Sequence, residues 1–160
     1  MDFALSETQS SVAGLAAELF TDFGTDERVR EIALSGAAYD TELWARLIET
    51  GLASLALPEA AGGGGLGIAE LLLVLEAQGR ALAPVPLWRH SLACLALATF
   101  AVGRARTELL PALVTGKIVA TASVEDIAAP ALALARNGSS WRLSGSVATF
   151  SRKFVYKAFG

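Results

Sequence analysis

The chain has 160 residues and a formal net charge of −3; 53% of its residues are hydrophobic and 18% are charged. The negative charge disfavours nucleic-acid binding by phosphate neutralisation, and the apolar composition excludes a disordered chain. The most apolar stretch, Ser91–Val102, is too short to span a bilayer, and the start of the chain lacks the basic segment and long apolar run of a signal peptide. The single cysteine, Cys94, has no disulfide partner within the chain, so we expect a buried thiol and a reducing, cytoplasmic location.

The first third of the chain has the pattern of three short helices. Ser6 begins the first, with Gln9 at the spacing of a capping box. Asp26 is expected to cap the second, which ends at Gly36, and Asp40 to cap the third. The apolar residues at helical spacing, which predict the buried faces, are Val12, Leu15, Ala16, Leu19, Val29, Ile32, Leu43, Trp44, Leu47 and Ile48.

A glycine-rich loop, Ala61–Gly65, precedes a second group of helices. The helix after this loop is expected to end at Gly79. Its predicted buried face consists of Ile68, Leu71, Leu72 and Leu75. Two prolines then break the chain before a long buried helix, Leu87–Phe100, and a shorter one, Thr107–Val114. Pro111 is expected to kink the shorter helix or to lie in its first turn.

The pattern changes from helical to strand-like after residue 117. Ile118–Val124 is apolar and β-branched, as a strand would be. Asn137-Gly138 is a strong hairpin signal. The two flanking strands are Ala131–Arg136 and Ser140–Val147. Trp141 and Leu143 alternate with polar residues, which predicts a half-buried strand.

The predicted fold class is therefore mainly α. We expect a multi-helix domain over residues 1–116, the first strands of an incomplete β-barrel-like domain over 117–150, and a divergent tail over 151–160. About three strands cannot close a barrel or cover their own edges.

Several residues could be given a catalytic or cofactor-binding role, but the surrounding sequence does not favour it. Gly62–Gly67 contains the G-x-G-x-x-G pattern before a helix, but helices follow it instead of the second strand of a βαβ unit, which favours a plain turn. His90 has no second histidine to act with, so a surface or helix-start position is expected. Glu125 and Asp126 would point to opposite faces of a strand and form no catalytic pair. No residue is assigned as a catalytic group or a metal ligand.

An ordered series of segments resembles the acyl-CoA dehydrogenase family. The segments are Met1–Gln9, Trp44–Leu47, Gly51–Glu59, Gly62–Gly67, Leu75–Arg80, Leu110–Gly116 and Leu143–Gly145. Each is common alone, but the order over Met1–Val147 is specific. The resemblance implies an N-terminal helical domain, a middle β-domain and a C-terminal four-helix domain, of which this chain supplies the first and starts the second.

The resemblance also implies a reaction, the removal of two hydrogens across the α–β bond of an acyl-CoA thioester. A carboxylate base takes the α-proton and FAD takes the β-hydride; the base usually lies in the C-terminal domain, so this chain alone is expected to be inactive. The flavin motif of the family, Thr-Glu-Pro followed by Gly-Ser-Asp, aligns with Ser123, Val124 and Glu125 as cofactor-binding candidates. Only Glu125 matches plainly, and Val124 replaces a threonine whose hydroxyl would face the flavin, so tight FAD binding by this chain alone is doubtful.

In the resembled family, the helix after the glycine-rich turn helps to line the acyl-chain pocket. The substrate-binding candidates on this helix are Leu72, Leu75, Glu76 and Gly79. The alternative for Glu76 is a charge at the edge of the core, paired with Arg80 or Arg46.

The leading hypothesis is an N-terminal portion of a FAD-dependent acyl-CoA dehydrogenase, which acts on an acyl-CoA within a homo- or hetero-oligomer. The alternatives are a non-catalytic partner subunit, a helical protein-interaction module, and a small dinucleotide-binding domain built on the glycine-rich loop.

Overall fold

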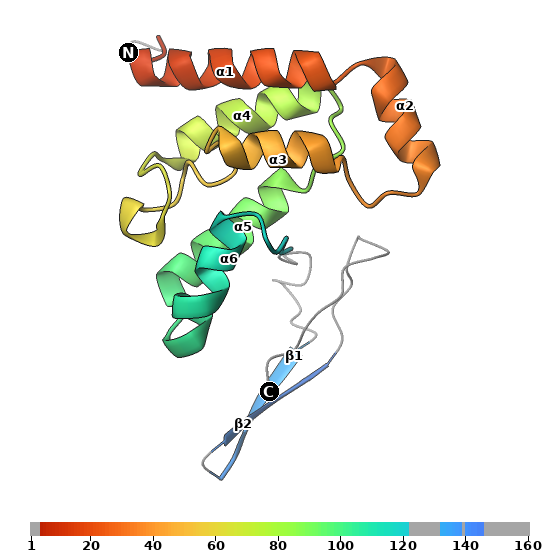
Figure 1. Ribbon diagram of the computed structural model, residues 1–160. Helices are drawn as coiled ribbons and strands as arrows, with labels where there is room; N and C mark the ends of the chain where they lie inside the picture. Colours follow the sequence, from red (N-terminus) through yellow and green to blue (C-terminus); the bar gives the residue numbers. More distant parts are fainter. Residues whose placement is uncertain (1–3, 122–131, 139, 146–160) are drawn as a thin grey trace. The chain divides into compact units, whose positions relative to one another are not determined.

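The computed structural model describes residues 4–121, 132–138 and 140–145 (Figure 1). The chain divides into two units, Met1–Thr121 and Ala122–Gly160, which are described separately. The helices of the first unit are α1 (Glu7–Phe23), α2 (Asp26–Ser35), α3 (Thr41–Glu49), the 3-10 turn η1 (Glu59–Ala61), α4 (Ile68–Arg80), α5 (Leu87–Phe100), the π-helical η2 (Ala105–Leu109) and α6 (Leu110–Val114). The strands of the second unit are β1 (Leu132–Asn137) and β2 (Ser140–Gly145). No helix of the described ranges is long and apolar enough to cross a bilayer.

The helix starts follow from side chains that satisfy free backbone N–H groups. The capping box at α1 is confirmed: Ser6 Oγ accepts from Gln9 N at 3.1 Å, and Gln9 Oε1 accepts from Ser6 N at 3.0 Å. The expected cap of α2 is wrong, because Thr25 occupies that position and its hydroxyl accepts from Arg28 N at 3.3 Å. Asp26 is instead the first helical residue, where its charge favours the helix N-terminus.

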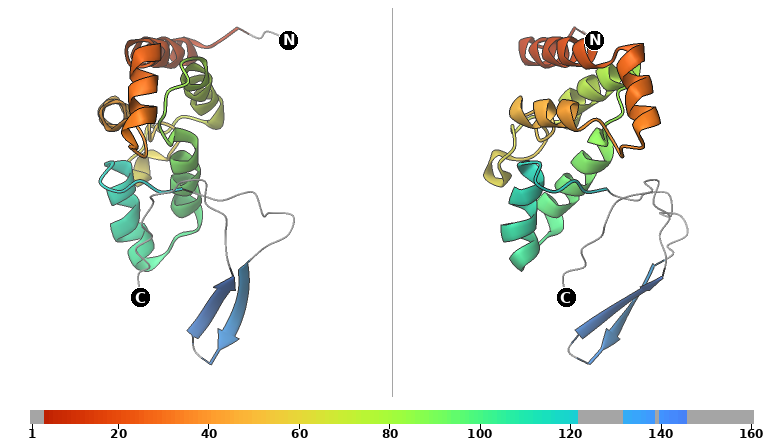
Figure 2. Two further views of the ribbon diagram at one scale, coloured as in Figure 1. Left: turned by 90° about the vertical axis from the view of Figure 1, so that its right-hand side faces the viewer. Right: turned by 45° about the vertical axis from the view of Figure 1, so that its right-hand side comes forward.

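The larger core lies between α1, α3, α4 and the segment that leads into α5. Helices α1 and α4 run side by side, and α2 stands at one end of this pair (Figure 2). The fully buried side chains of this core include Phe20, Leu43, Leu47, Val74 and Leu87. A smaller cluster joins α5 to α6 through Leu57, Cys94, Leu110 and Leu113.

The predicted buried face of α4 is only partly correct. Leu71 is buried, but Val74 takes the second core position, while Ile68 and Leu72 are each 58% exposed. Apolar residues occupy nearly every position from Ile68 to Leu75, so their spacing could not define one face. Helix α4 therefore carries a second, exposed apolar face.

The chain between α5 and the end of the first unit differs from the predicted helix and strand. The π-helical turn η2 precedes α6, with the Leu110 N–H bonded to the Ala105 carbonyl. Pro111 lies in the first turn of α6, where its missing N–H costs little, and the wider turn avoids a clash of the proline ring with the preceding α-turn. The described part of the expected strand, 118–121, is not a strand, since the Ile118 N–H donates to Ala112 O at the end of α6. Its remainder, 122–124, lies outside the described residues.

The second unit contains the expected hairpin. Strands β1 and β2 pair antiparallel around Gly138, whose φ of 64° needs a residue without a Cβ. Leu134 lies directly opposite Leu143, on the same face as Trp141, as the alternation predicts. The expectation of half-burial is wrong among the described residues, because Trp141 and Leu143 are 64% and 63% exposed. Among the described residues the sheet has two strands, which are too few to bury an apolar face between them.

Candidate functional site

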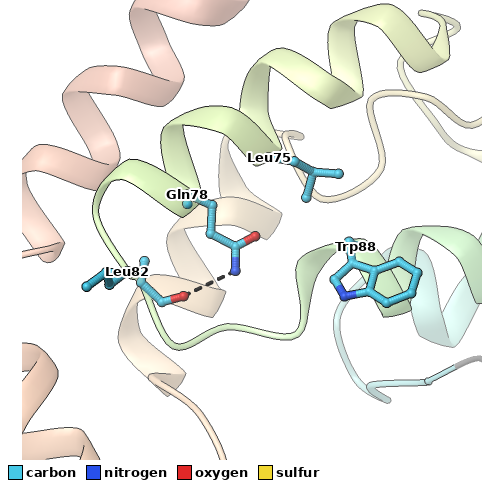
Figure 3. Close-up of a pocket in the computed structure, with 6 residues that line it drawn as sticks. Leu75, Gln78, Leu82 and Trp88 are labelled. Atoms are coloured by element: carbon cyan, nitrogen blue, oxygen red, sulfur yellow. Dashed lines mark hydrogen bonds between the residues drawn. The ribbon is translucent and has the colours of Figure 1, made fainter.

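A pocket of about 320 Å³ lies where α4 ends and α5 begins (Figure 3). Its lining residues are Leu75, Gln78 and Gly79 from α4, Leu82 and Ala83 from the connecting segment, and Trp88 from α5. The pocket is a shallow hollow that is widely open to solvent, and most of its lining is aliphatic or aromatic. This arrangement suits an extended apolar group that enters from solvent.

Gln78 fixes the chain that closes one side of this pocket. Its Nε2 donates to the carbonyl of Ala83 at 3.1 Å and to the carbonyl of Val85 at 2.8 Å. Between these bonds and the helix, Leu82 adopts a left-handed conformation with φ of 49°, which costs about 1 kcal/mol in a residue with a side chain. The two bonds from Gln78 offset this cost and return the chain toward Trp88.

The four predicted substrate-binding residues separate into two pairs. Leu75 and Gly79 line the pocket. Leu72 is exposed on the outer face of α4 and is absent from the lining. Glu76 is exposed and pairs with Arg80 at 2.6 Å, which is the alternative that the sequence left open for it. Contact of any of the four with a substrate stays a prediction.

The sequence did not predict four of the residues that line the pocket: Gln78, Leu82, Ala83 and Trp88. Gln78 lies three residues after Leu75 on the same helical face, so helical spacing was a usable signal for it. The other three depend on how the segment after α4 turns back, and no local pattern encodes that turn.

The flavin-contact candidates Ser123, Val124 and Glu125 lie outside the described residues. Their contact with a cofactor stays a prediction.

His90 lies in the first turn of α5, as the helix-start alternative expected, but its side chain is buried and not at the surface. It is 1% exposed in the first turns of α5, and its ring meets Trp44 edge-on at 4.9 Å between centroids. Its Nδ1 accepts from the Ala120 N–H at 3.2 Å, so the ring proton belongs on Nε2, which lies 3.4 Å from Cys94 Sγ. Burial lowers the pKa of His90 to about 4, against a smaller opposing effect of a hydrogen bond to the Leu113 backbone.

Cys94 is a buried thiol, as expected from the sequence. Burial raises its pKa to about 12, so the nucleophilic thiolate is not populated at neutral pH. His90 and Cys94 therefore hold α5 against the chain after α6, and their chemistry is structural.

The glycine-rich loop does not have the geometry of a phosphate cradle. The N–H groups of Gly63, Gly64 and Gly65 donate to the carbonyls of Pro58, Ser54 and Leu57. At the start of α4 the Glu70 carboxylate accepts from Gly67 N at 2.8 Å and so occupies the position where a phosphate would bind. A Cβ on Gly63 would lie 2.3 Å from the Cβ of Leu57, so this glycine serves close packing.

A second hollow, of about 580 Å³, lies between η1 and α6. Its polar side chains already have partners within the chain: Arg106 donates to the Ala98 carbonyl at 2.7 Å, and the Thr115 hydroxyl donates to the Pro111 carbonyl at 2.9 Å. It differs in chemistry from the pocket beside α4, because the cationic Arg106 and the hydroxyls of Thr107 and Thr115 lie among its apolar side chains.

Comparison with known proteins identifies the helical unit. Residues 6–117 match the family model described as "Acyl-CoA dehydrogenase, N-terminal domain". The chain belongs to the acyl-CoA dehydrogenase family. This assignment, with the mainly helical fold and the beginning of a β-domain, confirms the resemblance read from the sequence.

Curated relatives come from mycobacteria. The chain is 33% identical over 148 residues to the acyl-CoA dehydrogenase FadE27 of Mycobacterium tuberculosis, covering 91% of this chain and 40% of that protein. It is 38% identical over 118 residues to the acyl-CoA dehydrogenase IpdE2 of Mycolicibacterium smegmatis, covering 73% and 37%. The chain thus spans well under half the length of these family members.

Two solved structures have a similar fold over this region. A variant of the Tcur3481–Tcur3483 steroid ACAD is 43% identical and superposes with a TM-score of 0.77, covering 87% of this chain and 40% of that one. The ChsE4–ChsE5 complex from Mycobacterium tuberculosis is 31% identical with a TM-score of 0.78, covering 91% and 40%.

Proposed function

We propose that this chain forms one wall of the acyl-binding site of an acyl-CoA dehydrogenase, which removes two hydrogens across the α–β bond of an acyl-CoA thioester. The observation that supports it is the apolar pocket at the end of α4, bounded by Leu75, Gly79 and Trp88. In this family the same helix helps to line the acyl-chain pocket. An acyl chain that covers these side chains gains about 25 cal/mol for each Å² of apolar surface removed from water.

The pocket supplies binding and exclusion of water, not proton transfer. None of its lining residues has a titratable side chain, and the nearby Glu76 is paired with Arg80 on the exposed face of α4. The carboxylate base therefore comes from another part of the assembly, and we propose that the 160-residue chain does not turn over acyl-CoA on its own.

We include FAD as the cofactor because acyl-CoA dehydrogenases use it. When bound, it accepts the β-hydride of the acyl group. The residues that would face it, Ser123, Val124 and Glu125, match the flavin motif of the family plainly only at Glu125. We accordingly assign the main flavin contacts to the complete assembly and expect weak binding by this chain.

The relatives support a hetero-oligomer as the working state. Two similar structures are described as the ChsE4–ChsE5 complex and the Tcur3481–Tcur3483 steroid ACAD, each of which names two components. In this chain the outer face of α4 exposes Ile68 and Leu72, and the adjoining segment exposes Leu82, which lines the pocket. We propose that a partner subunit covers this face and completes the acyl site, with this chain as the non-catalytic member.

Acyl binding is tested with the purified chain and dodecanoyl-CoA by isothermal titration calorimetry. Saturable binding is expected, whereas coenzyme A alone binds at least ten-fold more weakly. Gly79→Met is expected to weaken dodecanoyl-CoA binding about ten-fold, because a Cβ at this position meets no atom within 4 Å and the longer side chain takes up pocket volume.

Glu76→Gln is the matched control, since Glu76 neighbours the pocket in sequence but does not line it. Its affinity should equal that of the wild-type chain. Equal binding of dodecanoyl-CoA by the wild-type and Gly79→Met chains, or no binding by the wild-type chain, would contradict the acyl site.

A further inference from the structure

The orientation of the Gln78 amide is fixed by its partners. The two hydrogen bonds of its side chain go to the carbonyl oxygens of Ala83 and Val85, and a carbonyl can only accept. The group that faces both carbonyls must therefore be the NH₂. The amide oxygen, Oε1, is left on the opposite side.

Oε1 faces the pocket. Figure 3 shows the amide nitrogen of Gln78 turned toward the connecting segment and the oxygen turned toward the side on which Leu75 and Trp88 lie. Both hydrogen bonds that the side chain makes to the connecting segment are donated by Nε2, so neither uses Oε1. Among the lining side chains it is the one strong acceptor, because the others are aliphatic or, in Trp88, offer only an indole N–H.

An acceptor in an apolar pocket discriminates between ligands. A purely hydrocarbon ligand that covers Oε1 removes its water and leaves it unpaired, which lowers affinity. A ligand hydroxyl at this point donates to Oε1 and restores the bond. A ligand carbonyl brings a second acceptor against the first and is disfavoured.

We propose that Gln78 makes this pocket selective for an apolar group that carries a hydroxyl, so that the acyl substrates of the assembly bear a hydrogen-bond donor away from the thioester. This inference rests on the proposed acyl-binding function. It adds a substrate class and a specificity-determining residue to that function.

The test uses the full chain labelled with ¹⁵N and two ring probes of nearly equal size, cyclohexanol and cyclohexanone. Titrations are followed by the NMR signals of the Trp88 indole and the Gln78 side-chain amide. The expected dissociation constant for cyclohexanol is about five-fold below that for cyclohexanone, as one net hydrogen bond allows. ω-Hydroxydodecanoyl-CoA and dodecanoyl-CoA provide the same comparison for an acyl ligand.

The variant Gln78→Lys distinguishes the effect of Gln78 on ligand preference from its effect on the segment between α4 and α5. Its ammonium can still donate to the carbonyls of Ala83 and Val85 but offers no acceptor. The backbone amide signals of Leu82 and Ala83 should stay in place, while the preference for cyclohexanol disappears. Gln78→Met, which removes both functions, should lose the preference and also shift those backbone signals.

Equal affinity of the wild-type chain for the two ring probes would overturn the inference. A preference that persists unchanged in Gln78→Lys would overturn it as well. Binding of dodecanoyl-CoA without any gain from the ω-hydroxyl overturns it while leaving the acyl site intact. A cyclohexanol preference that depends on Gln78, in a chain that binds no acyl-CoA, supports the hydroxyl site and contradicts only the acyl function.

Discussion

Asp40 holds together three parts of the helical unit. Its carboxylate, 1% exposed, accepts from Arg28 Nε at 2.6 Å and also caps α3 through Leu43 N at 3.0 Å. Its own N–H donates to the Pro84 carbonyl at 2.9 Å, in the segment that closes the pocket. The Arg28 hydrogen bond is the largest of the effects that keep the pKa of Asp40 below its usual value. Asp40 therefore links α2, α3 and the α4–α5 connection.

We expect Asp40→Ala to lower the free energy of unfolding by about 3 kcal/mol. This value is at the lower end of the range for breaking a buried ion pair, because the Arg28 side chain is 28% exposed to solvent. Urea denaturation measures this change. Glu42→Gln removes only the exposed second partner of Arg28 and should cost less than 1 kcal/mol. Similar losses in the two variants would contradict the role of Asp40.

The burial of His90 should make the free energy of unfolding depend on pH. Its pKa falls from 6.5 to about 4 on folding, so the unfolded chain binds more protons between these values. The stability contributed by the neutral ring is complete above pH 6.5 and is lost as the pH falls toward 4, by about 3 kcal/mol in total. Asp40, whose lowered pKa starts from 3.8, acts mostly below this window.

The measurement is urea denaturation of the wild-type and His90→Phe chains at several pH values between 4 and 7. Phenylalanine keeps a ring against Trp44 but does not titrate. The difference in stability between the two chains should shrink as the pH falls. A difference that is constant with pH would show that His90 is protonated normally in the folded chain.

Two glycines in neighbouring elements should respond oppositely to the same substitution. Gly79 lies within the last turn of α4, and a Cβ there meets nothing within 4 Å, so Gly79→Ala should stabilise the chain by about 0.5–1 kcal/mol. Gly63 packs on Leu57, where a Cβ would overlap, so Gly63→Ala should destabilise it by about 1–3 kcal/mol. Thermal denaturation distinguishes the two signs, and a loss of stability in Gly79→Ala would contradict the open site.

The elements that were predictable are those with local signals. The capping box at Ser6, the limits Leu87–Phe100 of α5 and the hairpin around Gly138 depend on residues close together in the chain, and the structure confirms them. Helix α4 was predicted, but its buried face was predicted only in part, at Leu71, because apolar residues occupy most positions of its first two turns. Burial of Val74 is decided by α1 and the core beneath it, which helical spacing alone does not encode.

The candidate site was predictable only where it lies on one helix. Leu75 and Gly79 follow from the position of α4 and the family resemblance. Trp88 and Ala83 reach the pocket because Gln78 holds the turn after α4, a contact between side chain and backbone with no sequence signature. The helix-start position of His90 was predicted, but its burial was not, since its partner Ala120 lies 30 residues away.

The whole chain corresponds to the N-terminal part of an acyl-CoA dehydrogenase. It covers 40% of FadE27, and its helical unit exposes apolar side chains beside the pocket. A monomer rarely leaves such a face uncovered without a use for it. We therefore expect the pocket at the end of α4 to receive an acyl chain.

Isotope-filtered nuclear Overhauser measurements between dodecanoyl-CoA and the labelled chain can locate the bound acyl chain. The acyl methylene protons should give contacts to the Leu75 methyl groups and the Trp88 indole. Contacts to Leu110 and Val114 instead would place the acyl chain in the hollow beside α6 and would rule out the pocket at the end of α4 as its binding site.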